Sequence, residues 1–364
     1  MKKIHRTLSL FTVTAMCAAL LCSCGAVPDS SQTDSSSKAA TTTTADTTAD
    51  TTTAGEASST ASAPDSSVSD SSSAVTDDTK TNGITPAMWK VTSPEGNTMV
   101  MLGSFHALKD ECYPLPEAVT NAYNNADILA VECDITSTSE DGEYMKNLMK
   151  QMLYNDNTKL SQHISEEAYS ALQTYLGYWG MDISALEVYR PWAVSSTLDT
   201  LLIQDSGFDS ENGLDNFLLT TAHADGKEIY EVESVDFQMN LLINFSDDIY
   251  DLMFRSYEGE TKESQKQALE DLYTAWKSGD IETFLEEDNE EELAGYTEED
   301  KKIAEDYNNQ MLYDRNKNMA KAAEDLMSQG KNVFYVVGAA HYAGEGGIID
   351  LLEKDGYTAE RVQY

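Results

Sequence analysis

Two apolar stretches, far apart in the chain, follow the same pattern. Residues 99–106 run Met-Val-Met-Leu-Gly-Ser-Phe-His, and residues 333–341 run Val-Phe-Tyr-Val-Val-Gly-Ala-Ala-His. A short apolar run that ends at a glycine is typical of a buried strand, and the loops at strand ends often carry chemistry. We therefore predict two strands whose ends bring His106 and His341 together.

Four further stretches have the composition of strands. Residues 87–93 precede a Pro-Glu-Gly-Asn turn, so they predict a β-hairpin with the strand that leads to His106. Residues 128–134 are mostly apolar, which indicates a strand buried on both faces. Residues 228–233 and 358–363 complete the set. The stretch 128–134 carries Glu132 near its end, and the stretch 228–233 ends at Glu233.

Between the strands, apolar residues recur at the three- and four-residue spacing of helices. Residues 245–305 combine this spacing with many acidic side chains and predict an inserted helical region over the site. In a helix predicted over 305–329, Arg315 shares a stripe with Met311 and Met319, so it faces inward and needs a partner. Strands alternating with helices predict an α/β (α+β) fold, with a central mixed, largely parallel sheet opened by a hairpin and flanked by helices.

The first 84 residues lack the pattern of a folded domain. Residues 1–24 have a basic start, a short apolar stretch and Leu-Cys-Ser-Cys at the end, which resembles a bacterial lipobox. The resemblance implies a lipid on Cys24 and a protein anchored on the extracytoplasmic face of the cell membrane; an ordinary signal peptide is the alternative. Residues 25–84 are mostly Ser, Thr, Ala and Asp and predict a disordered stalk, which leaves 85–364 as the folded domain.

The formal net charge of −39 narrows the range of partners. A surface this acidic repels phosphate backbones, so we expect no nucleic-acid partner. Beyond the signal peptide and Cys24, the chain has two cysteines, Cys112 and Cys133. They could pair in an oxidising compartment, but their spacing in sequence does not tell whether their Cα atoms come within bonding range.

Four strand ends carry groups that bind metals or move protons: His106, Glu132, Glu233 and His341. In sheets of this class, ligands bind beyond the carboxyl ends of the strands. Imidazole and carboxylate together suit Mn, Fe, Co or Zn. We expect both histidines to be ligands, with one glutamate completing the shell and the other acting as general base. The alternative is that the histidines are buried structural residues.

Two arginines are candidates for the same site. Arg190 or Arg315 could stabilise a developing oxyanion or hold a substrate carboxylate through two hydrogen bonds. Either could instead only form salt bridges with Glu132 or Glu233. If both histidines bind one metal, their side chains should lie within about 5 Å of each other.

These motifs, in this order, resemble the TraB/GumN family, which is related to the Tiki metalloproteases and more distantly to erythromycin esterase/ChaN-like proteins. For the Tiki branch the resemblance implies a divalent-metal-dependent peptidase, with Mn or Co suggested, that uses the two Gly-x-x-His histidines and strand-end glutamates. For TraB-like members it implies shutdown of a peptide pheromone. The matching motifs are Leu102-Gly-Ser-Phe-His106, Tyr113-Pro-Leu-Pro116, Ala130-Val-Glu-Cys-Asp134, Arg190-Pro-Trp192, Gly213-Leu-Asp215, Glu233 with Gln238, Arg315-Asn316, and Val337-Gly-Ala-Ala-His341 with Gly344.

Two functions of different classes follow. The first is a surface-tethered, metal-dependent hydrolase that uses Mn, Co or Zn and acts on a peptide or another small molecule. The second is a non-catalytic binding lipoprotein that captures a peptide pheromone or haem, for which Tyr113, Tyr189 and Tyr342 lie beside the motifs. An inactive structural relative is a third possibility, for which the sequence offers no direct sign.

Overall fold

The computed structural model describes residues 83–139, 141–285 and 295–364. The signal peptide, the lipid attachment at Cys24 and almost all of the stalk lie outside the described residues, so these remain predictions. Among the helices that are described, none combines the length and the apolar character needed to cross a membrane.

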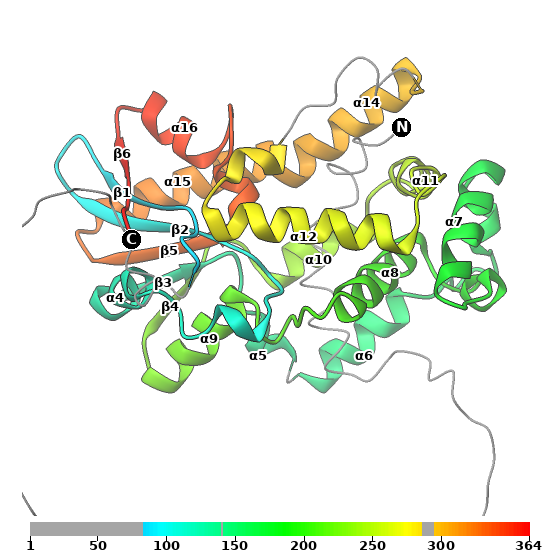
Figure 1. The fold of residues 1–364 in the computed structure, drawn as a ribbon, viewed down its shortest axis with the longest axis horizontal. Helices are drawn as coiled ribbons and strands as arrows, with labels where there is room; N and C mark the ends of the chain where they lie inside the picture. The colour runs from blue at the N-terminus through cyan, green and yellow to red at the C-terminus, as the bar shows by residue number, and fades with distance from the viewer. Residues whose placement is uncertain (1–82, 140, 286–294) are drawn as a thin grey trace, which may run out of the picture. The chain divides into compact units, whose positions relative to one another are not determined.

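A mixed sheet forms the centre of the described part of the chain, as predicted (Figure 1). The strand order is β4-β3-β5-β2-β1-β6. Strand β5 is parallel to β2 and β3, and β3 is parallel to β4, whereas β1 is antiparallel to β2 and β6. The strands are β1 (Met88–Thr92), β2 (Thr98–Ser104), β3 (Ile128–Val131), β4 (Glu228–Glu231), β5 (Val333–Gly338) and β6 (Thr358–Arg361).

The two strands that carry the repeated pattern are neighbours in this sheet. Strand β2 pairs with β5 so that Ser104 lies opposite Gly338. Every residue of β3 and of β5 is buried, which explains why both read as continuous apolar runs. The hairpin between β1 and β2 turns at Gly96, whose φ of 90° favours glycine.

Helices occupy most of the remaining chain. They are α4 (Glu117–Asn125), α5 (Ile135–Ser139), α6 (Gly142–Gln151), α7 (Glu166–Tyr178), α8 (Pro191–Asp205), α9 (Leu214–Asp225), α10 (Val235–Ile243), α11 (Asp247–Arg255), α12 (Lys262–Ser278), α14 (Glu298–Asn308), α15 (Asp314–Ser328) and α16 (Ile348–Lys354). Short 3-10 turns are η1 (Asp110–Cys112), η2 (Leu160–Gln162), η3 (Ile183–Leu186), η4 (Ile281–Leu285) and η6 (Ala339–Tyr342).

The predicted helix over 305–329 is in fact two helices joined by a π-helical turn, η5 (Asn309–Tyr313). An extra residue in a turn of this kind changes which side chains face inward afterwards. Arg315 follows directly in α15, and its side chain is fully buried. The acidic stretch contains α11, α12 and α14, and α12 ends at Gly279 in a left-handed conformation.

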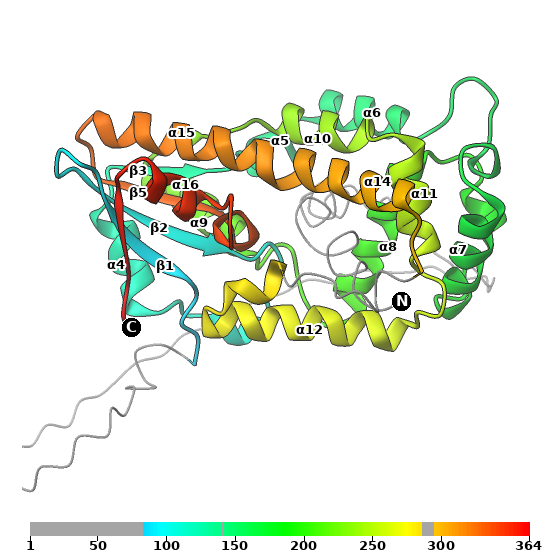
Figure 2. The ribbon, with the colours of Figure 1, turned by 90° about the horizontal axis from the view of Figure 1, so that it is seen from above.

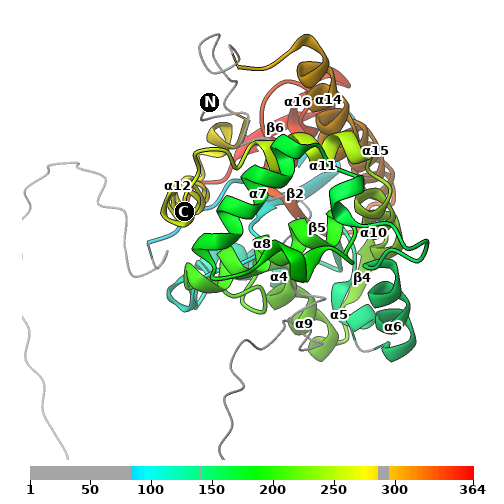
Figure 3. The ribbon, with the colours of Figure 1, turned by 90° about the vertical axis from the view of Figure 1, so that its right-hand side faces the viewer.

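Two hydrophobic cores meet at the carboxyl ends of the parallel strands. One core lies around the sheet, and the other lies among α6, α7, α8, α10 and α11, which Figure 2 places beyond the tip of β2. Figure 3 looks onto this helical part from its far side. Cys133 and Ala340 are buried in the second core, although the strands before them belong to the first. Their neighbours in the chain, Glu132 just before Cys133 and His341 just after Ala340, therefore lie at the boundary between the two cores.

Cys112 and Cys133 are both buried, and neither forms a disulfide in the described part of the chain. The Cys112 sulfur lies 2.9 Å from the hydroxyl of Tyr273, and the Cys133 sulfur lies 3.5 Å from Oε1 of Gln238. The question of a disulfide, which the sequence left open, is settled against one in this structure.

Candidate functional site

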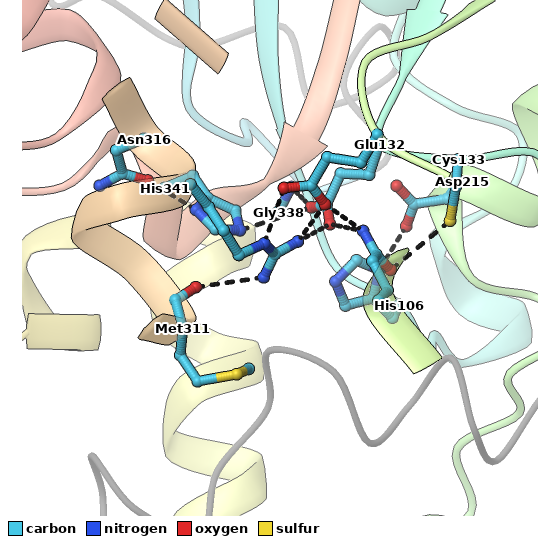
Figure 4. Close-up of polar contacts among 11 residues, drawn as sticks. His106, Glu132, Cys133, Asp215, Met311, Asn316, Gly338 and His341 are labelled. Atoms are coloured by element: carbon cyan, nitrogen blue, oxygen red, sulfur yellow. Dashed lines mark hydrogen bonds and ion pairs between the residues drawn. The ribbon is translucent and has the colours of Figure 1, made fainter. Parts of the chain in front are cut away.

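Three of the predicted site residues surround one small space at the end of the sheet (Figure 4). A Cβ atom placed on Gly338 would lie 3.1 Å from Glu132 Oε1, 3.3 Å from His106 Nε2 and 3.5 Å from His341 Cδ2. The lack of a side chain at Gly338 therefore leaves a gap that all three side chains face. We call this space the Gly338 gap.

His106 reaches the gap from the loop after β2, and Asp215 holds it there. The Nδ1 atom of His106 donates a hydrogen bond of 2.7 Å to Oδ2 of Asp215, in the first turn of α9, which leaves Nε2 toward the gap. Burial alone lowers the pKa of His106, but the charge and hydrogen bond of Asp215 outweigh burial and raise the pKa to about 9. His106 is therefore a cation at neutral pH in the metal-free protein.

The close approach of α9 to the His106 loop depends on a glycine. A Cβ atom on Gly213 would lie 2.1 Å from the carbonyl oxygen of His106, which is well inside any allowed contact. The amide of Leu214 also donates to the carbonyl of Phe105 at 3.1 Å. The Gly-Leu-Asp motif thus has a physical reason: the glycine admits the loop, and Asp215 then meets the histidine.

His341 lies in η6, directly after β5, and is held by an amide instead of a carboxylate. Asn316 Nδ2 donates to the carbonyl of Gly346 at 2.9 Å, so Oδ1 of Asn316 faces His341 Nδ1 at 2.6 Å and accepts its proton. Burial, with Arg315 nearby, lowers the pKa of His341 to about 3. The ring is therefore neutral, with its free lone pair on Nε2. That atom is buried and has no hydrogen-bond partner among the described residues.

Glu132 directly follows β3 and offers one oxygen to the gap. Its Oε1 accepts a hydrogen bond from the Gly338 amide at 2.7 Å and lies 3.7 Å from Nε2 of His341. Its Oε2 accepts from Arg315 Nη2 at 2.7 Å and from Gln238 Nε2 at 2.9 Å. Burial favours the neutral acid, but Arg315 and the two histidines outweigh it and lower the pKa of Glu132 to about 2.

Glu233 and Arg315 form the support behind Glu132 and do not face the gap. Both oxygens of Glu233 are used, Oε1 by Arg315 Nε at 2.9 Å, and Oε2 by Arg315 Nη2 at 2.8 Å and Gln238 Nε2 at 2.7 Å. Arg315 also donates from Nη1 to the carbonyl of Met311 at 3.1 Å, in the π-helical turn. The guanidinium is largely satisfied, so it positions Glu132 and has little capacity left for a substrate.

Arg190 does not join this group of residues. It precedes α8, and its Nη2 donates to the carbonyl of Ile243 at 3.1 Å. Within the described residues it forms no ion pair with Glu132 or Glu233, both of which pair with Arg315. The structure thus brings His106, Glu132 and His341 to one space, with Glu233 and Arg315 behind them and Arg190 elsewhere.

The donor atoms at the gap suit a divalent metal, although they are not closed around one. No group of three or more His, Cys, Asp or Glu side chains in the described residues is already spaced to hold an ion. Two ligand atoms of a tetrahedral ion, each about 2.0–2.1 Å from it, lie roughly 3.3–3.4 Å apart. The 3.7 Å between Glu132 Oε1 and His341 Nε2 is close to that value. A small movement of side chains that are already aimed at one point would complete the set.

Four residues of this site received no role from the sequence: Asp215, Gln238, Asn316 and Gly338. Each lies in or beside one of the motifs, which was the available signal. Their roles depend on contacts between distant parts of the chain. Asp215 is 109 residues away in sequence from His106, its hydrogen-bond partner, and Gln238 is 106 residues away from Glu132. Hydrogen bonds to the outer nitrogens of both histidines are the usual support of metal-binding imidazoles.

The chain is similar to several curated proteins. The uncharacterized protein YbaP of Escherichia coli (strain K12) is 26% identical over 157 residues, covering 43% of this chain and 56% of that protein. A metalloprotease TIKI homolog of Nematostella vectensis is 24% identical over 293 residues, covering 68% of this chain and 61% of that protein. Metalloprotease TIKI2 of Danio rerio is 24% identical over 188 residues, covering 47% of this chain and 36% of that protein. The chain thus spans between about a third and three fifths of the length of these relatives.

The search of solved structures gave no significant match. The model of the TraB/PrgY/gumN family matches residues 87–361, a range that includes every strand of the sheet and every residue of the Gly338 gap. Because this range covers most of the chain, the protein belongs to the TraB/PrgY/gumN family.

Proposed function

We propose that the folded domain is a metal-dependent hydrolase that cleaves peptides, with His106, Glu132 and His341 as its metal ligands. The observation that carries this proposal is the buried Nε2 of His341, a neutral lone pair beside the Gly338 gap. It lies 3.7 Å from Glu132 Oε1 and has no hydrogen-bond partner in the described residues. A buried polar atom without a partner is costly unless a ligand uses it. The TIKI relatives, which are named as metalloproteases, support the same reaction class.

The chemistry of the donors fits the cations expected from the sequence. Two imidazoles and one carboxylate suit Mn, Co or Zn, with open positions for other ligands. We leave Glu233 out of this set because Arg315 holds both of its oxygens, whereas Glu132 turns Oε1 toward the gap and meets Arg315 only through Oε2. When bound, a divalent cation supplies Lewis acidity, which polarises a carbonyl group and activates water.

The side chains of the protein then have distinct tasks. Glu132 Oε1 is the carboxylate oxygen at the gap, so it is the atom available to bind the cation or accept a proton. The Gly338 amide and Arg315 fix the position of that carboxylate. Asp215 and Asn316 fix the ring orientation of His106 and His341. Both cores exclude water from the back of the site.

Metal analysis and peptide cleavage by the purified protein test this proposal. We expect about one equivalent of Mn, Co or Zn after dialysis, and cleavage within a peptide library that a chelator abolishes. His106→Ala and His341→Ala should each lower metal affinity by about a hundredfold or more, whereas His163→Ala, at a histidine bound to Asp247, should not. A wild-type protein that takes up no metal would overturn the proposal.

The alternative of haem capture has no specific observation in its favour. The hydroxyl of Tyr113 donates to the carbonyl of Asn212 at 2.7 Å, and that of Tyr342 donates to the carbonyl of Tyr335 at 3.2 Å. Both groups are thus already used within the fold.

Tethering by a lipid on Cys24 remains part of the proposal and has a separate test. Fatty-acid labelling of the expressed full chain should mark the wild type and leave Cys24→Ser unmarked. Equal labelling of the two proteins would contradict the lipid anchor without touching the hydrolase proposal.

A further inference from the structure

One buried polar group near the gap has no role so far, and it is the hydroxyl of Ser104. Ser104 is the last residue of β2, two positions before His106, and only 2% of its surface is exposed. Its Oγ has no hydrogen-bond partner among the described residues. A buried hydroxyl that lacks a partner destabilises a fold, and an alanine at this position would avoid that cost.

The register of the sheet shows which way this hydroxyl faces. Ser104 lies directly opposite Gly338 in the β2–β5 pair. Side chains of laterally paired residues share a face of the sheet, and successive residues alternate between faces. A Cβ on Gly103 would meet Ala339, at 3.0 Å, on the other face. The Ser104 side chain is therefore on the face where a Cβ of Gly338 would point, which is the face of the gap.

The polar groups around the gap leave one task open. In the proposed cation-bound site, Nε2 of both histidines and Oε1 of Glu132 are all acceptors toward the cation. An oxygen atom of the acyl ligand that the cation does not hold needs a hydrogen-bond donor, and acceptors cannot provide one. A neutral hydroxyl can, because it is a donor that rotates to meet its partner.

We propose that Ser104 is a substrate-binding residue whose Oγ–H donates a hydrogen bond to an oxygen of an acyl ligand bound in the Gly338 gap. This inference rests on the proposed hydrolase function. It divides the work of the site: His106, Glu132 and His341 hold the cation, and Ser104 holds the ligand oxygen. A site that offers a hydrogen-bond donor to a ligand loses affinity when the donor is removed.

Three variants of the full chain test the assignment, with acetohydroxamate as the oxygen ligand of the Mn²⁺-loaded protein. Ser104→Ala removes the hydroxyl, and Ser104→Thr keeps it. Ser206→Ala is the matched control, because Ser206 Oγ is also buried without a partner but lies at the end of α8, away from the gap. Thermal melting in a chelator, Mn²⁺ affinity and acetohydroxamate affinity are measured for each protein.

We expect both alanine variants to melt at the same temperature as the metal-free wild type or about 2–4 °C higher, since each loses an unpaired buried hydroxyl. Mn²⁺ affinity should stay within threefold of wild type in all three. Acetohydroxamate affinity should fall about tenfold in Ser104→Ala alone, which is the effect of one lost hydrogen bond of ordinary strength. Ser104→Thr, which keeps a hydroxyl group, should keep most of the acetohydroxamate affinity of the wild type.

Other outcomes separate the two proposals. A wild type that binds Mn²⁺, with equal acetohydroxamate affinity in Ser104→Ala, would overturn the role of Ser104 and leave the hydrolase proposal intact. A metal-free Ser104→Ala protein that melts several degrees lower would show that the hydroxyl has a structural partner, and it would also overturn the inference. A wild type that takes up none of Mn, Co and Zn would overturn both.

Discussion

The two Gly-x-x-His segments have the same motif on neighbouring strands but opposite electrostatics. His106 donates from Nδ1 to the carboxylate of Asp215, and its pKa is raised to about 9 because that charge outweighs burial. His341 donates from Nδ1 to the amide of Asn316, and burial with Arg315 nearby lowers its pKa to about 3. The side chain of His106 is 15% exposed, whereas that of His341 is fully buried.

The difference teaches that the motif places an imidazole but does not set its charge. The charge is set by the surroundings of each ring, which other parts of the chain supply. Asp215 of α9 raises the pKa of His106, whereas burial and Arg315 of α15 lower the pKa of His341. The outcome is one cationic and one neutral ring facing the same gap. Altering the partners should therefore alter the rings without touching the motif.

The largest effect on stability should follow from removing the guanidinium group of Arg315, which supports Glu132. Arg315→Met leaves Glu132 and Glu233 buried without their shared partner. We expect a loss of about 3–5 kcal/mol in the free energy of unfolding, because breaking one side of a buried ion pair leaves uncompensated charge. Urea unfolding of the metal-free protein measures it.

Arg255→Met is the matched control for this change. Arg255 pairs with Asp251 and Asp300, but its side chain is 31% exposed, so its removal should cost about 1 kcal/mol or less. Equal losses in the two variants would show that the cluster behind the gap is not the stabilising element we describe.

Replacing Asp215, the partner of His106, should remove the rise in the pKa of His106. Asp215→Asn keeps an acceptor for Nδ1 but removes the charge that raises the pKa of His106. A group whose pKa rises on folding, here from 6.5 to about 9, stabilises the fold fully below pH 6.5 and loses that contribution as the pH rises to about 9. The shift corresponds to about 3 kcal/mol.

Urea unfolding of the chelated wild type should therefore show this loss between pH 6.5 and 9. The Asp215→Asn protein should be less stable at pH 6 and nearly flat over the same range. A variant with the same slope as the wild type would mean that another group is responsible for the pH dependence.

A smaller effect on stability should come from giving His341 a carboxylate partner at Nδ1, as His106 has. Asn316→Asp places a carboxylate at Nδ1 and removes the donor to the carbonyl of Gly346. We expect the free energy of unfolding to fall by about 1–2 kcal/mol at neutral pH, since one buried hydrogen bond is lost. The pKa of His341 should rise from about 3, which ¹⁵N chemical shifts of the ring nitrogens can follow. An unchanged ring titration would refute the idea that a carboxylate at Nδ1 raises the pKa of a ring in this site.

The sequence was sufficient for the strands and for the residues that directly follow them. Strands β3 and β5 are buried on both faces, so their apolar runs are long and unambiguous. Their carboxyl ends share one edge of the sheet, and this alone predicts that His106, Glu132 and His341 meet. The inward orientation of Arg315 also followed from its apolar stripe.

The sequence was insufficient for roles that depend on the packing of helices. Glu132 and Glu233 look equivalent at two strand ends, and only the position of Arg315 shows that Glu233 is fully occupied. Arg190 opens a helix beside a motif, but its guanidinium meets a backbone carbonyl of α10. Periodicity also could not reveal the π-helical turn before α15, because a single extra residue barely alters the apolar spacing.

The smallest effect on stability should come from the residue that lies between the two histidines. Gly338→Ala introduces a methyl group 3.1 to 3.5 Å from Glu132, His106 and His341, and the φ of −51° at this position is suitable for alanine. The tight contacts and the reduced freedom of the unfolded chain oppose each other, so the free energy of unfolding should change by less than about 1 kcal/mol. Metal affinity should nevertheless fall about tenfold or more, because the methyl group occupies the space that the three ligands share. Gly96→Ala, in the hairpin turn with φ of 90°, should show the reverse, a loss of stability with no change in metal affinity. If Gly338→Ala bound metal as the wild type does, the two histidines would not act on a common ion, and the contrast between them would concern the stability of the fold alone.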